Sequence, residues 1–388
     1  MRQISNNICR IKIALNSVKQ LAQKYSEIKE SKGIPGIGEA STSWERLLKC
    51  KNCGLEGVMR VDEASAECSR CRTSFNVTSG IVDFVSGTAN TTLDVLAYDQ
   101  QKSVSLESSL RLFRHMKQLS QGIIPDQLGT VLEVGAGTGY LTLGMLADSE
   151  FDRAVITDIS PQMLKIIGSR LEGSAPKKRH RTLLATYSGA EDIFAERSFD
   201  LCVSNSVLHH IFDYSGFLRR KRALLKPSGV AIFAEPGAAF HDALTLAMSD
   251  AIVGLIGAKA VSATEVCILA AWVEQTRFRL LSPPDAPALA ELEDKHMFSR
   301  QEIEKLAREA GFSGASVLPF GYDPLGVQAA GGYAKDLGVA PDILPRLVAA
   351  YEHSAEYFFR NIEQRDMSEM YFICFHAGQR DFRQGMSR

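Results

Sequence analysis

The sequence has no excess of charge of either sign and few aromatic residues. Its 388 residues carry 44 Lys and Arg against 45 Asp and Glu, for a formal net charge of −1 at pH 7. A chain with that balance has no overall basic field to draw it to nucleic acid, although local basic patches could still bind phosphates. Aromatic residues make up 8% of the chain and are seldom interleaved with basic ones in 46–85. RNA recognition combines charge with stacking, so both shortages weigh against an RNA ligand.

Long apolar runs are also absent. No segment has the length and apolar character of a membrane span or a secretion signal. Two apolar stretches, Ala243–Ile256 and Val266–Trp272, are interrupted by Asp250 and Glu265. We therefore expect a cytoplasmic protein without a membrane partner, whose cysteines stay reduced.

The most informative stretch is 131–139, which reads Val-Leu-Glu-Val-Gly-Ala-Gly-Thr-Gly. It predicts a strand that turns sharply on three glycines into a helix beginning near Tyr140, whose amides and dipole point at a ligand over the turn. A dinucleotide fingerprint would have a third glycine where Tyr140 stands, so no pyrophosphate is expected. A second strand, 154–157, ends on Asp158. A carboxylate there can accept both hydroxyls of a ribose, which predicts a nucleoside-cofactor site.

Two further segments continue the pattern. Residues 198–211, Ser-Phe-Asp-Leu-Cys-Val-Ser-Asn-Ser-Val-Leu-His-His-Ile, predict a fourth strand and its exit loop, and 224–233 predict a helix end, a Pro-Ser-Gly turn and a fifth strand. With the glycine turn, these segments resemble class I S-adenosylmethionine-dependent methyltransferases, in the broad type 11 group. The resemblance covers 128–236 and resumes at 298–311 and 370–375.

This resemblance implies the fold and the cofactor. The expected fold class is α/β: a Rossmann-like methyltransferase with a mostly parallel seven-stranded sheet, a small N-terminal zinc ribbon and helical lid insertions. The expected cofactor is S-adenosylmethionine. Relatives have a Gly-Asp-Ala triplet where this chain has Ser188-Gly189-Ala190, so the Ala190 amide and the Glu191 carboxylate are expected to meet the adenine. The candidate cofactor-binding residues are Tyr98, Glu133, Gly135, Ala136, Gly137, Gly139, Asp158, Ile159, Met163, Ala190, Glu191, Asn205 and Ser206.

The candidate catalytic residues are His209, His210 and Glu235. Methyl transfer from a sulfonium depends on in-line positioning, and a hydroxyl acceptor also needs a general base, for which histidine is suited. Paired histidines at this place can equally serve packing or loop hydrogen bonds. Asn205-Ser206 stands where enzymes that methylate exocyclic base nitrogens have a Pro-Pro-Tyr type loop, which argues against that chemistry.

Four of the eight cysteines form two Cys-x-x-Cys pairs, Cys50 with Cys53 and Cys68 with Cys71, separated by fourteen residues. Two such knuckles can offer four thiolates to one tetrahedral Zn²⁺, and four cysteines leave no open position for catalysis. Disulfides are the alternative interpretation, which the absence of other signs of secretion disfavours. The stretch through 80–84 resembles short zinc ribbons ahead of bacterial methyltransferases and in ribosomal RNA methyltransferases.

The chain divides into several predicted regions. Residues 1–30 predict an amphipathic helix that docks on the body, forms a homodimer seam or serves as a basic targeting helix. The zinc ribbon is expected at 45–86 and the methyltransferase domain at 92–379. Helical insertions at 237–296 and 321–366 are expected above the carboxyl ends of the strands, as a lid over an acceptor pocket or a dimer interface.

These observations favour methyl transfer to a hydroxyl or nitrogen of a small-molecule acceptor, such as a secondary metabolite, held under a helical lid. The alternative is an rRNA or tRNA methyltransferase whose zinc ribbon docks the substrate. Basic runs at 177–181 and 219–222 would then contact phosphates, although they are also compatible with solvated surface.

Overall fold

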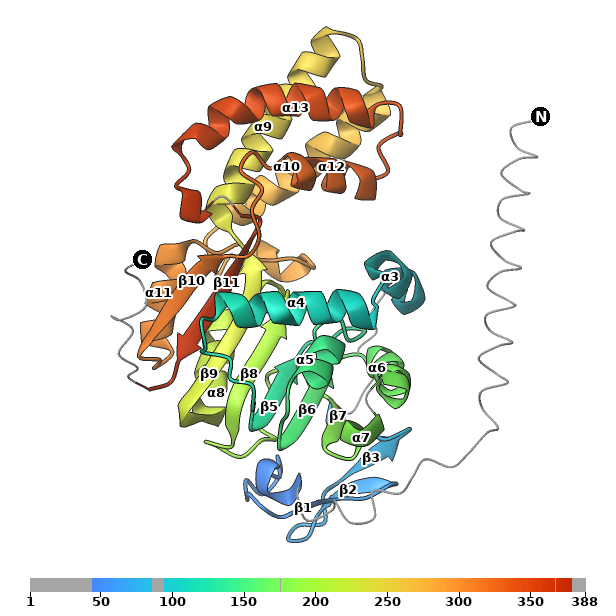
Figure 1. Cartoon of the computed structure of the whole chain (residues 1–388), viewed down its shortest axis with the longest axis vertical. Coiled ribbons are helices and arrows are strands. Elements are labelled where there is room, and N and C mark those ends of the chain that lie inside the picture. Colours follow the sequence, from blue (N-terminus) through green and yellow to red (C-terminus); the bar gives the residue numbers. More distant parts are fainter. Residues whose placement is uncertain (1–43, 86–93, 175, 367, 379–388) are drawn as a thin grey trace, which may run out of the picture. The chain divides into compact units, whose positions relative to one another are not determined.

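Figure 1 presents the computed structural model of the chain. It describes residues 44–85, 94–174, 176–366 and 368–378, so the helix predicted at 1–30 lies outside the described residues. The strands are β1 (Met59–Val61), β2 (Ser65–Cys68), β3 (Ser74–Thr78), β4 (Ile81–Asp83), β5 (Thr130–Val134), β6 (Arg153–Asp158), β7 (Thr182–Thr186), β8 (Phe199–Asn205), β9 (Leu225–Pro236), β10 (Gly314–Pro319) and β11 (Met370–His376).

The α-helices are α3 (Val95–Lys102), α4 (Leu106–Leu119), α5 (Thr142–Asp148), α6 (Pro161–Ser174), α7 (Pro176–Arg179), α8 (Tyr214–Leu224), α9 (Ala238–Gly257), α10 (Ala263–Leu281), α11 (Arg300–Glu309), α12 (Val327–Asp336) and α13 (Leu344–Phe358). Short 3₁₀ helices are η2 (Glu45–Leu47), η3 (Leu208–His210), η4 (Pro287–Glu291), η5 (Phe359–Asn361) and η6 (Gln364–Asp366).

The strands form one sheet in the order β1-β2-β3-β4-β7-β6-β5-β8-β9-β11-β10. The segment from β4 through β7, β6, β5 and β8 to β9 is parallel, while β11 runs antiparallel to β9 and β10 antiparallel to β11. The α/β Rossmann-like prediction is confirmed, but the predicted seven strands are wrong. The sheet has 11 strands of mixed direction because β4 pairs with β7 and carries β1–β3 with it.

Two apolar cores cover the two faces of the sheet. Every residue of β5 and β7 is buried, as in parallel strands packed on both sides. Neighbouring side chains point to opposite faces, so Val131 lies in one core and Leu132 in the other. Helices α4, α5 and α6 pack on the first face, which is that of Val131. Helices α8 and α11 pack on the second face, which is that of Leu132. These helices hold the strands rigid and leave the loops at the strand ends to carry the site.

The cysteine-containing segment shares the second of these cores. Leu47, Met59 and Val61 are buried in the same apolar cluster as side chains of β8, β9 and α8. Backbone hydrogen bonds from Lys49 to the Ile193 carbonyl and from Ala195 to the Leu47 carbonyl continue the contact. This segment is too small to form an apolar core of its own, and its apolar side chains pack into the core of the sheet instead.

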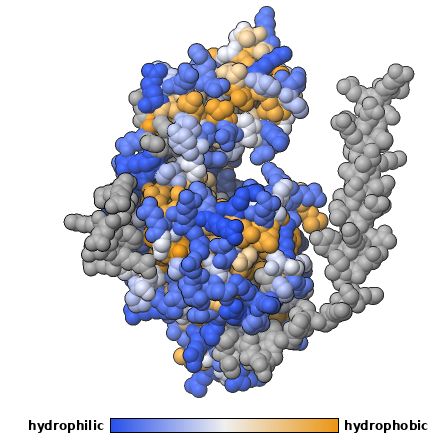
Figure 2. Space-filling model, viewed as in Figure 1, coloured by the Kyte–Doolittle hydropathy of each residue, from blue (hydrophilic) through white to orange (hydrophobic). Residues whose placement is uncertain are grey.

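Helices α9, α10, α12 and α13 gather into a helical layer with its own apolar core, which Figure 1 draws beyond the end of β9. α9 follows β9 through Gly237, so the layer begins at the carboxyl edge of the parallel strands. Among the described helices, only α9 is long and apolar enough to span a membrane. In its most apolar 18-residue stretch, 56% is buried inside the protein, as in the core helix of a soluble protein. Figure 2 shows apolar side chains on the outer surface of this layer as well.

Candidate functional site

The glycine turn after β5 brings several predicted residues together. Gly135 and Gly137 have φ angles of +66° and +56°, which side chains other than glycine rarely adopt. A Cβ on Gly135 would lie 2.3 Å from Val207 Cγ2, so only glycine fits against the loop after β8. A Cβ on Gly137 would lie 3.9 Å from the Tyr98 hydroxyl, so Tyr98 of α3 covers the turn. Tyr98, Gly135 and Gly137 therefore lie together at this turn, and cofactor binding there stays a prediction.

Asp158 ends β6 beside the same turn. Its Oδ2 accepts a hydrogen bond of 2.8 Å from the Gly137 amide, and its Oδ1 accepts one of 2.8 Å from the Ser160 amide. Burial raises the pKa of Asp158, and these backbone hydrogen bonds offset only part of that rise. The carboxylate thus fixes the turn, and its remaining lone pairs are what a ribose could use.

The side chain of Glu133 is enclosed by the protein and is not exposed at the turn. Its fully buried Oε2 accepts a hydrogen bond of 2.8 Å from the Thr142 hydroxyl of α5. Burial raises the pKa of Glu133 to about 8, against the smaller lowering effect of Thr142. This side chain ties β5 to the helix that follows the glycine turn.

The two residues expected to contact adenine, Ala190 and Glu191, are both hydrogen-bonded to Ser188. Glu191 accepts hydrogen bonds from the amide and the hydroxyl of Ser188, at 2.9 and 2.7 Å, and the Ala190 amide donates to the Ser188 hydroxyl at 3.3 Å. Next to Asp158, Ile159 is 40% exposed, whereas Met163 of α6 is buried. Ile159 thus offers an apolar surface beside the turn, and an adenine would have to share or replace the Ser188 contacts.

Asn205 and Ser206 follow β8 at the same edge of the sheet. Ser206 has φ of +59°, a backbone conformation that is unfavourable for serine and is often found where a loop must approach a ligand. Its amide donates to the Ala234 carbonyl of β9. The Asn205 side-chain amide donates to the Ser206 hydroxyl at 3.5 Å.

Glu235, near the end of β9, anchors the loop that carries the two histidines. Its Oε1 accepts the amides of Val207 and Leu208 at 3.0 and 2.7 Å. Its Oε2 accepts the His209 amide at 3.2 Å and pairs with His209 Nδ1 at 2.7 Å. The carboxylate is completely buried. A carboxylate on Nδ1 fixes the ring and leaves Nε2 as the nitrogen that can exchange a proton.

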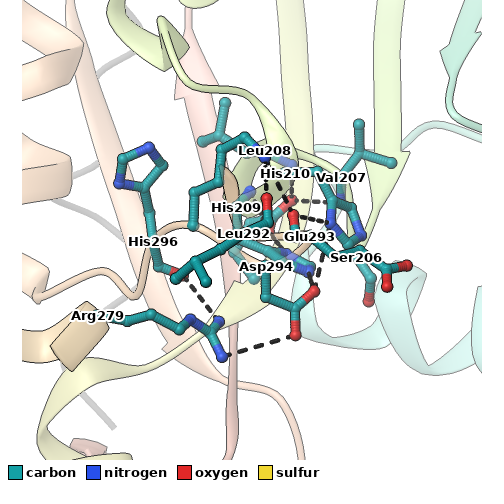
Figure 3. Close-up of polar contacts among 12 residues, drawn as sticks. Ser206, Val207, Leu208, His209, His210, Arg279, Leu292, Glu293, Asp294 and His296 are labelled. Atoms are coloured by element: carbon teal, nitrogen blue, oxygen red, sulfur yellow. Dashed lines mark hydrogen bonds and ion pairs between the residues drawn. The ribbon is translucent and has the colours of Figure 1, made fainter. Parts of the chain in front are cut away.

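Nε2 of His209 faces a second carboxylate, which comes from the first insertion. Asp294 Oδ1 lies 3.5 Å from His209 Nε2 and 3.3 Å from His210 Nδ1, and Asp294 Oδ2 lies 3.6 Å from a guanidinium nitrogen of Arg279. Figure 3 shows Asp294 between the imidazole and the guanidinium. Neither Asp294 nor Arg279 was predicted from the sequence, because no motif marks them within the insertion.

These contacts decide the charge of His209. Burial by itself lowers the pKa of His209, but the charge of Glu235 and the hydrogen bonds with Asp294 and Glu235 outweigh it and raise the pKa to about 9. For Asp294, burial raises the pKa, but the hydrogen bond from His209 and the charges of His209 and Arg279 bring it below its usual range. His209 is therefore an imidazolium at neutral pH in this arrangement.

The neighbouring histidines have other partners. His210 Nδ1 donates to the Glu293 carbonyl at 3.0 Å, and burial, followed by the charge of His209, lowers its pKa. His241 is buried against the Gly237 carbonyl and the Tyr333 hydroxyl, at 2.8 and 3.2 Å. His296 packs edge-on against Tyr214. Of these groups, only His209 combines a buried carboxylate on one nitrogen with a second nitrogen at the site.

A cavity of about 400 Å³ lies between α12, the segment that follows β10 and the residues just before β11. Tyr322, Asp323, Tyr333 and Glu369 are among its lining residues. The Tyr333 hydroxyl donates to Glu369 at 2.6 Å, which ties the second insertion to the residue before β11. The insertions thus contribute a hollow as well as side chains at this edge of the sheet.

The four cysteines of the N-terminal segment converge. Cys50 and Cys71 sulfurs lie 3.5 Å apart, Cys53 and Cys68 sulfurs 3.7 Å apart, and all four lie within 4.8 Å of one another. A tetrahedral Zn²⁺ with bonds of about 2.3 Å would space its sulfurs by about 3.8 Å. All four are free cysteines rather than disulfides, so the donor set and its spacing fit a zinc ion.

Comparison with known proteins identifies the central part of the chain. Residues 132–231 match the family Methyltransf_12, described as a methyltransferase domain; the narrower type 11 grouping stays a prediction. The reducing polyketide synthase Preu2 of Preussia isomera is 33% identical over 105 residues, and the hybrid PKS-NRPS synthetase iccA of Talaromyces variabilis is 36% identical over 107. Each match covers 27% of this chain but only 4% and 3% of these much longer relatives.

Solved structures show partial similarity. The CurJ carbon methyltransferase is 15% identical, with a TM-score of 0.41, over 75% of this chain and 60% of that one. The domain match, together with the sheet and its glycine turn, establishes that the chain carries a methyltransferase domain of the S-adenosylmethionine-dependent kind.

Proposed function

We propose that this methyltransferase transfers the methyl group of S-adenosylmethionine to a carbon atom of a small molecule, at a position made acidic by two flanking carbonyl groups. The observation that carries the proposal is the His209–Glu235 pair, with its Nδ1–Oε2 distance of 2.7 Å and its buried carboxylate. With His209 in its neutral form, this pair is suited to remove a proton from the acceptor.

A general base at the site favours acceptors that must lose a proton before methylation. A neutral amine can attack the methyl group with its own lone pair, whereas a carbon acid or a hydroxyl must lose a proton. A carbon between two carbonyls is a much stronger acid than an aliphatic hydroxyl, so a neutral imidazole such as that of His209 can remove its proton more readily. The proposed acceptor atom is therefore carbon, whereas the sequence predicted a hydroxyl oxygen or a nitrogen.

The named relatives support this choice. Preu2 and iccA are a polyketide synthase and a hybrid PKS-NRPS synthetase, and a polyketide contains carbons flanked by carbonyl groups. The comparisons do not favour the RNA alternative. The chain spans only a few per cent of these relatives, so the acceptor class rests on the dyad together with the likeness over the domain.

The residues divide the work as follows. S-adenosylmethionine supplies the methyl group as a sulfonium. We assign the binding of its ribose to Asp158, beside the glycine turn, whose backbone the cofactor can approach closely. Nε2 of His209 takes the acceptor proton while Glu235 stabilises the imidazolium. The electron pair of the broken carbon–hydrogen bond forms the carbon–methyl bond, and the pair of the broken sulfur–methyl bond stays on sulfur.

For the cysteine cluster we propose a structural Zn²⁺ held by Cys50, Cys53, Cys68 and Cys71. Its place is the end of the sheet that β1–β4 form, because Cys68 ends β2 and β4 pairs with β7. With four thiolate ligands the ion has no open position for substrate, so its role is to stabilise this part of the sheet.

The test is to identify the atom that receives the label. The protein is incubated with S-adenosylmethionine bearing a ¹³C methyl group and, separately, the acetoacetyl thioester of N-acetylcysteamine, a primary alcohol, a primary amine and total RNA. Carbon-13 NMR is expected to find a new methyl carbon bonded to the carbon between the two carbonyls. Label only on oxygen, nitrogen or RNA would contradict the proposal.

A further inference from the structure

Asp294 occupies the position on His209 that an acceptor must use. Nδ1 of His209 is taken by Glu235, so proton transfer has to pass through Nε2. Nε2 lies 3.5 Å from Asp294 Oδ1, and the other oxygen of the same carboxylate lies 3.6 Å from the Arg279 guanidinium. An anion is thus held between an imidazole and a guanidinium.

We propose, on the basis of the proposed function, that Asp294 is a displaceable stand-in for the acceptor: the enolate formed from the acceptor takes its place between His209 and Arg279 during turnover. Asp294 is then a positioning residue, and Arg279 is the group that recognises the carbonyl oxygen on which the enolate's charge gathers.

The structure separates a fixed backbone from a movable side chain. The amides of Lys295 and His296 donate to the His209 carbonyl at 2.8 and 3.2 Å, which fixes the loop against the catalytic residue. The Asp294 side chain is 48% exposed. Rotation about its side-chain bonds can therefore carry the carboxylate into solvent while the loop stays in place.

The guanidinium of Arg279 is suited to bind an anion. Its side chain is only 9% exposed, and its buried Nε has no hydrogen-bond partner among the described residues. One terminal nitrogen donates to the His296 carbonyl at 3.4 Å, which orients the guanidinium. Once Asp294 leaves, a buried cation with free donors remains, and an enolate oxygen can satisfy it.

Displacement also resolves the protonation state. While Asp294 is in place, two carboxylates hold His209 as an imidazolium, which cannot accept a proton. Removal of one negative neighbour lowers the pKa of His209 and favours the neutral ring that catalysis needs. Several titratable or charged groups interact electrostatically with His209: Glu235 of β9, His210 of η3, His241 of α9, and Asp294 and His296 of the loop. Arg279 of α10 interacts electrostatically with Asp294, His241 and His296.

The experiment compares the wild type with Asp294→Asn, and with Asp285→Asn as a matched control on an exposed part of the same insertion. The pKa of His209 is measured by NMR titration of each full-length protein, and the pH dependence of kcat and kcat/KM is measured with acetoacetyl-N-acetylcysteamine. The profile of kcat/KM reports the free enzyme and that of kcat reports the complex.

We expect Asp294→Asn to lower the pKa of His209 in the free protein and to move the acid limb of kcat/KM to lower pH by the same amount. The acid limb of kcat should stay where it is in the wild type, because Asp294 has already left His209 in the complex. Asp285→Asn should change neither profile. A second variant, Arg279→Gln, should lower kcat/KM for the thioester about tenfold or more without changing the affinity for S-adenosylmethionine, since it loses a charged hydrogen bond to the enolate oxygen.

Two results would overturn the inference. Either the pKa of His209 is unchanged in Asp294→Asn, or the acid limb of kcat moves together with that of kcat/KM, which would mean that Asp294 stays on His209 throughout turnover. Failure of the proposed function is a separate outcome, because the wild type itself would then leave the acceptor carbon unmethylated.

Discussion

At the scale of single residues, Glu235 explains why the loop after β8 carries a catalytic histidine. A fully buried carboxylate is costly unless its lone pairs are used, and Glu235 accepts three backbone amides and one imidazole nitrogen. The backbone amides fix the loop, and the imidazole bond fixes the ring. One side chain thus positions both the loop and the base.

Asp158 also has two tasks. It accepts the amides of Gly137 and Ser160, and in the account above it binds the ribose. Asp158→Ala should therefore weaken the binding of S-adenosylmethionine by about 1.5–3 kcal/mol, the value of a charge-assisted hydrogen bond, or roughly 10- to 150-fold in Kd. Isothermal titration calorimetry measures this change.

Asp152→Ala is the control, because Asp152 is an exposed residue just before the other end of the same strand. An unchanged Kd in Asp158→Ala would sink the ribose assignment.

At the scale of elements, the site depends on where strands end. β8 is followed by η3 with His209, and β9 ends one residue after Glu235. These strands are parallel neighbours, so their carboxyl ends meet at one edge and the two side chains come together. The sequence predicted that both side chains lie at this edge, because both strands were recognisable as apolar segments that end in polar residues, but it did not predict their hydrogen bond.

Other element-scale features were beyond the sequence. β4 is a three-residue strand whose partner, β7, begins about a hundred residues later. Local periodicity carries no information on such a pairing, so the sheet was expected to end at seven strands instead of 11. Glu133 shows the same limit, since its contact with Thr142 depends on how α5 lies on β5.

The cysteine cluster yields a test at this scale. Cys53→Ser removes one of four thiolates and should release the metal and lower Tm, because structural zinc sites contribute on the order of 10–16 kcal/mol in small peptides. Elemental analysis of the purified protein and thermal unfolding measure the two effects.

Cys267→Ser is the matched control, since Cys267 is an exposed free cysteine on α10. Retention of one zinc per chain in Cys53→Ser would refute the site.

At the scale of the whole molecule, the site joins the sheet to the insertions. His209 and Glu235 come from the sheet edge, whereas Arg279 and Asp294 come from the far end of a segment that includes α9 and α10. The sequence indicated a lid, and composition alone could not indicate which of its many charged residues return to the histidine. That information lies in the packing of the helical layer, where Arg279 is buried and Asp294 is not.

The account rests on His209 as the base, and one measurement tests it most directly. His209→Asn keeps an amide donor for Glu235 but has no nitrogen that can accept a proton. We compare the single-turnover rate of methyl transfer to acetoacetyl-N-acetylcysteamine in the wild type, in His209→Asn and in His180→Ala, an exposed histidine distant in sequence. His209→Asn should be slower by about 10²- to 10⁴-fold, the usual contribution of a general base, while still binding S-adenosylmethionine, and His180→Ala should match the wild type. A His209→Asn rate within about threefold of the wild type would contradict the account, since loss of a general base costs far more.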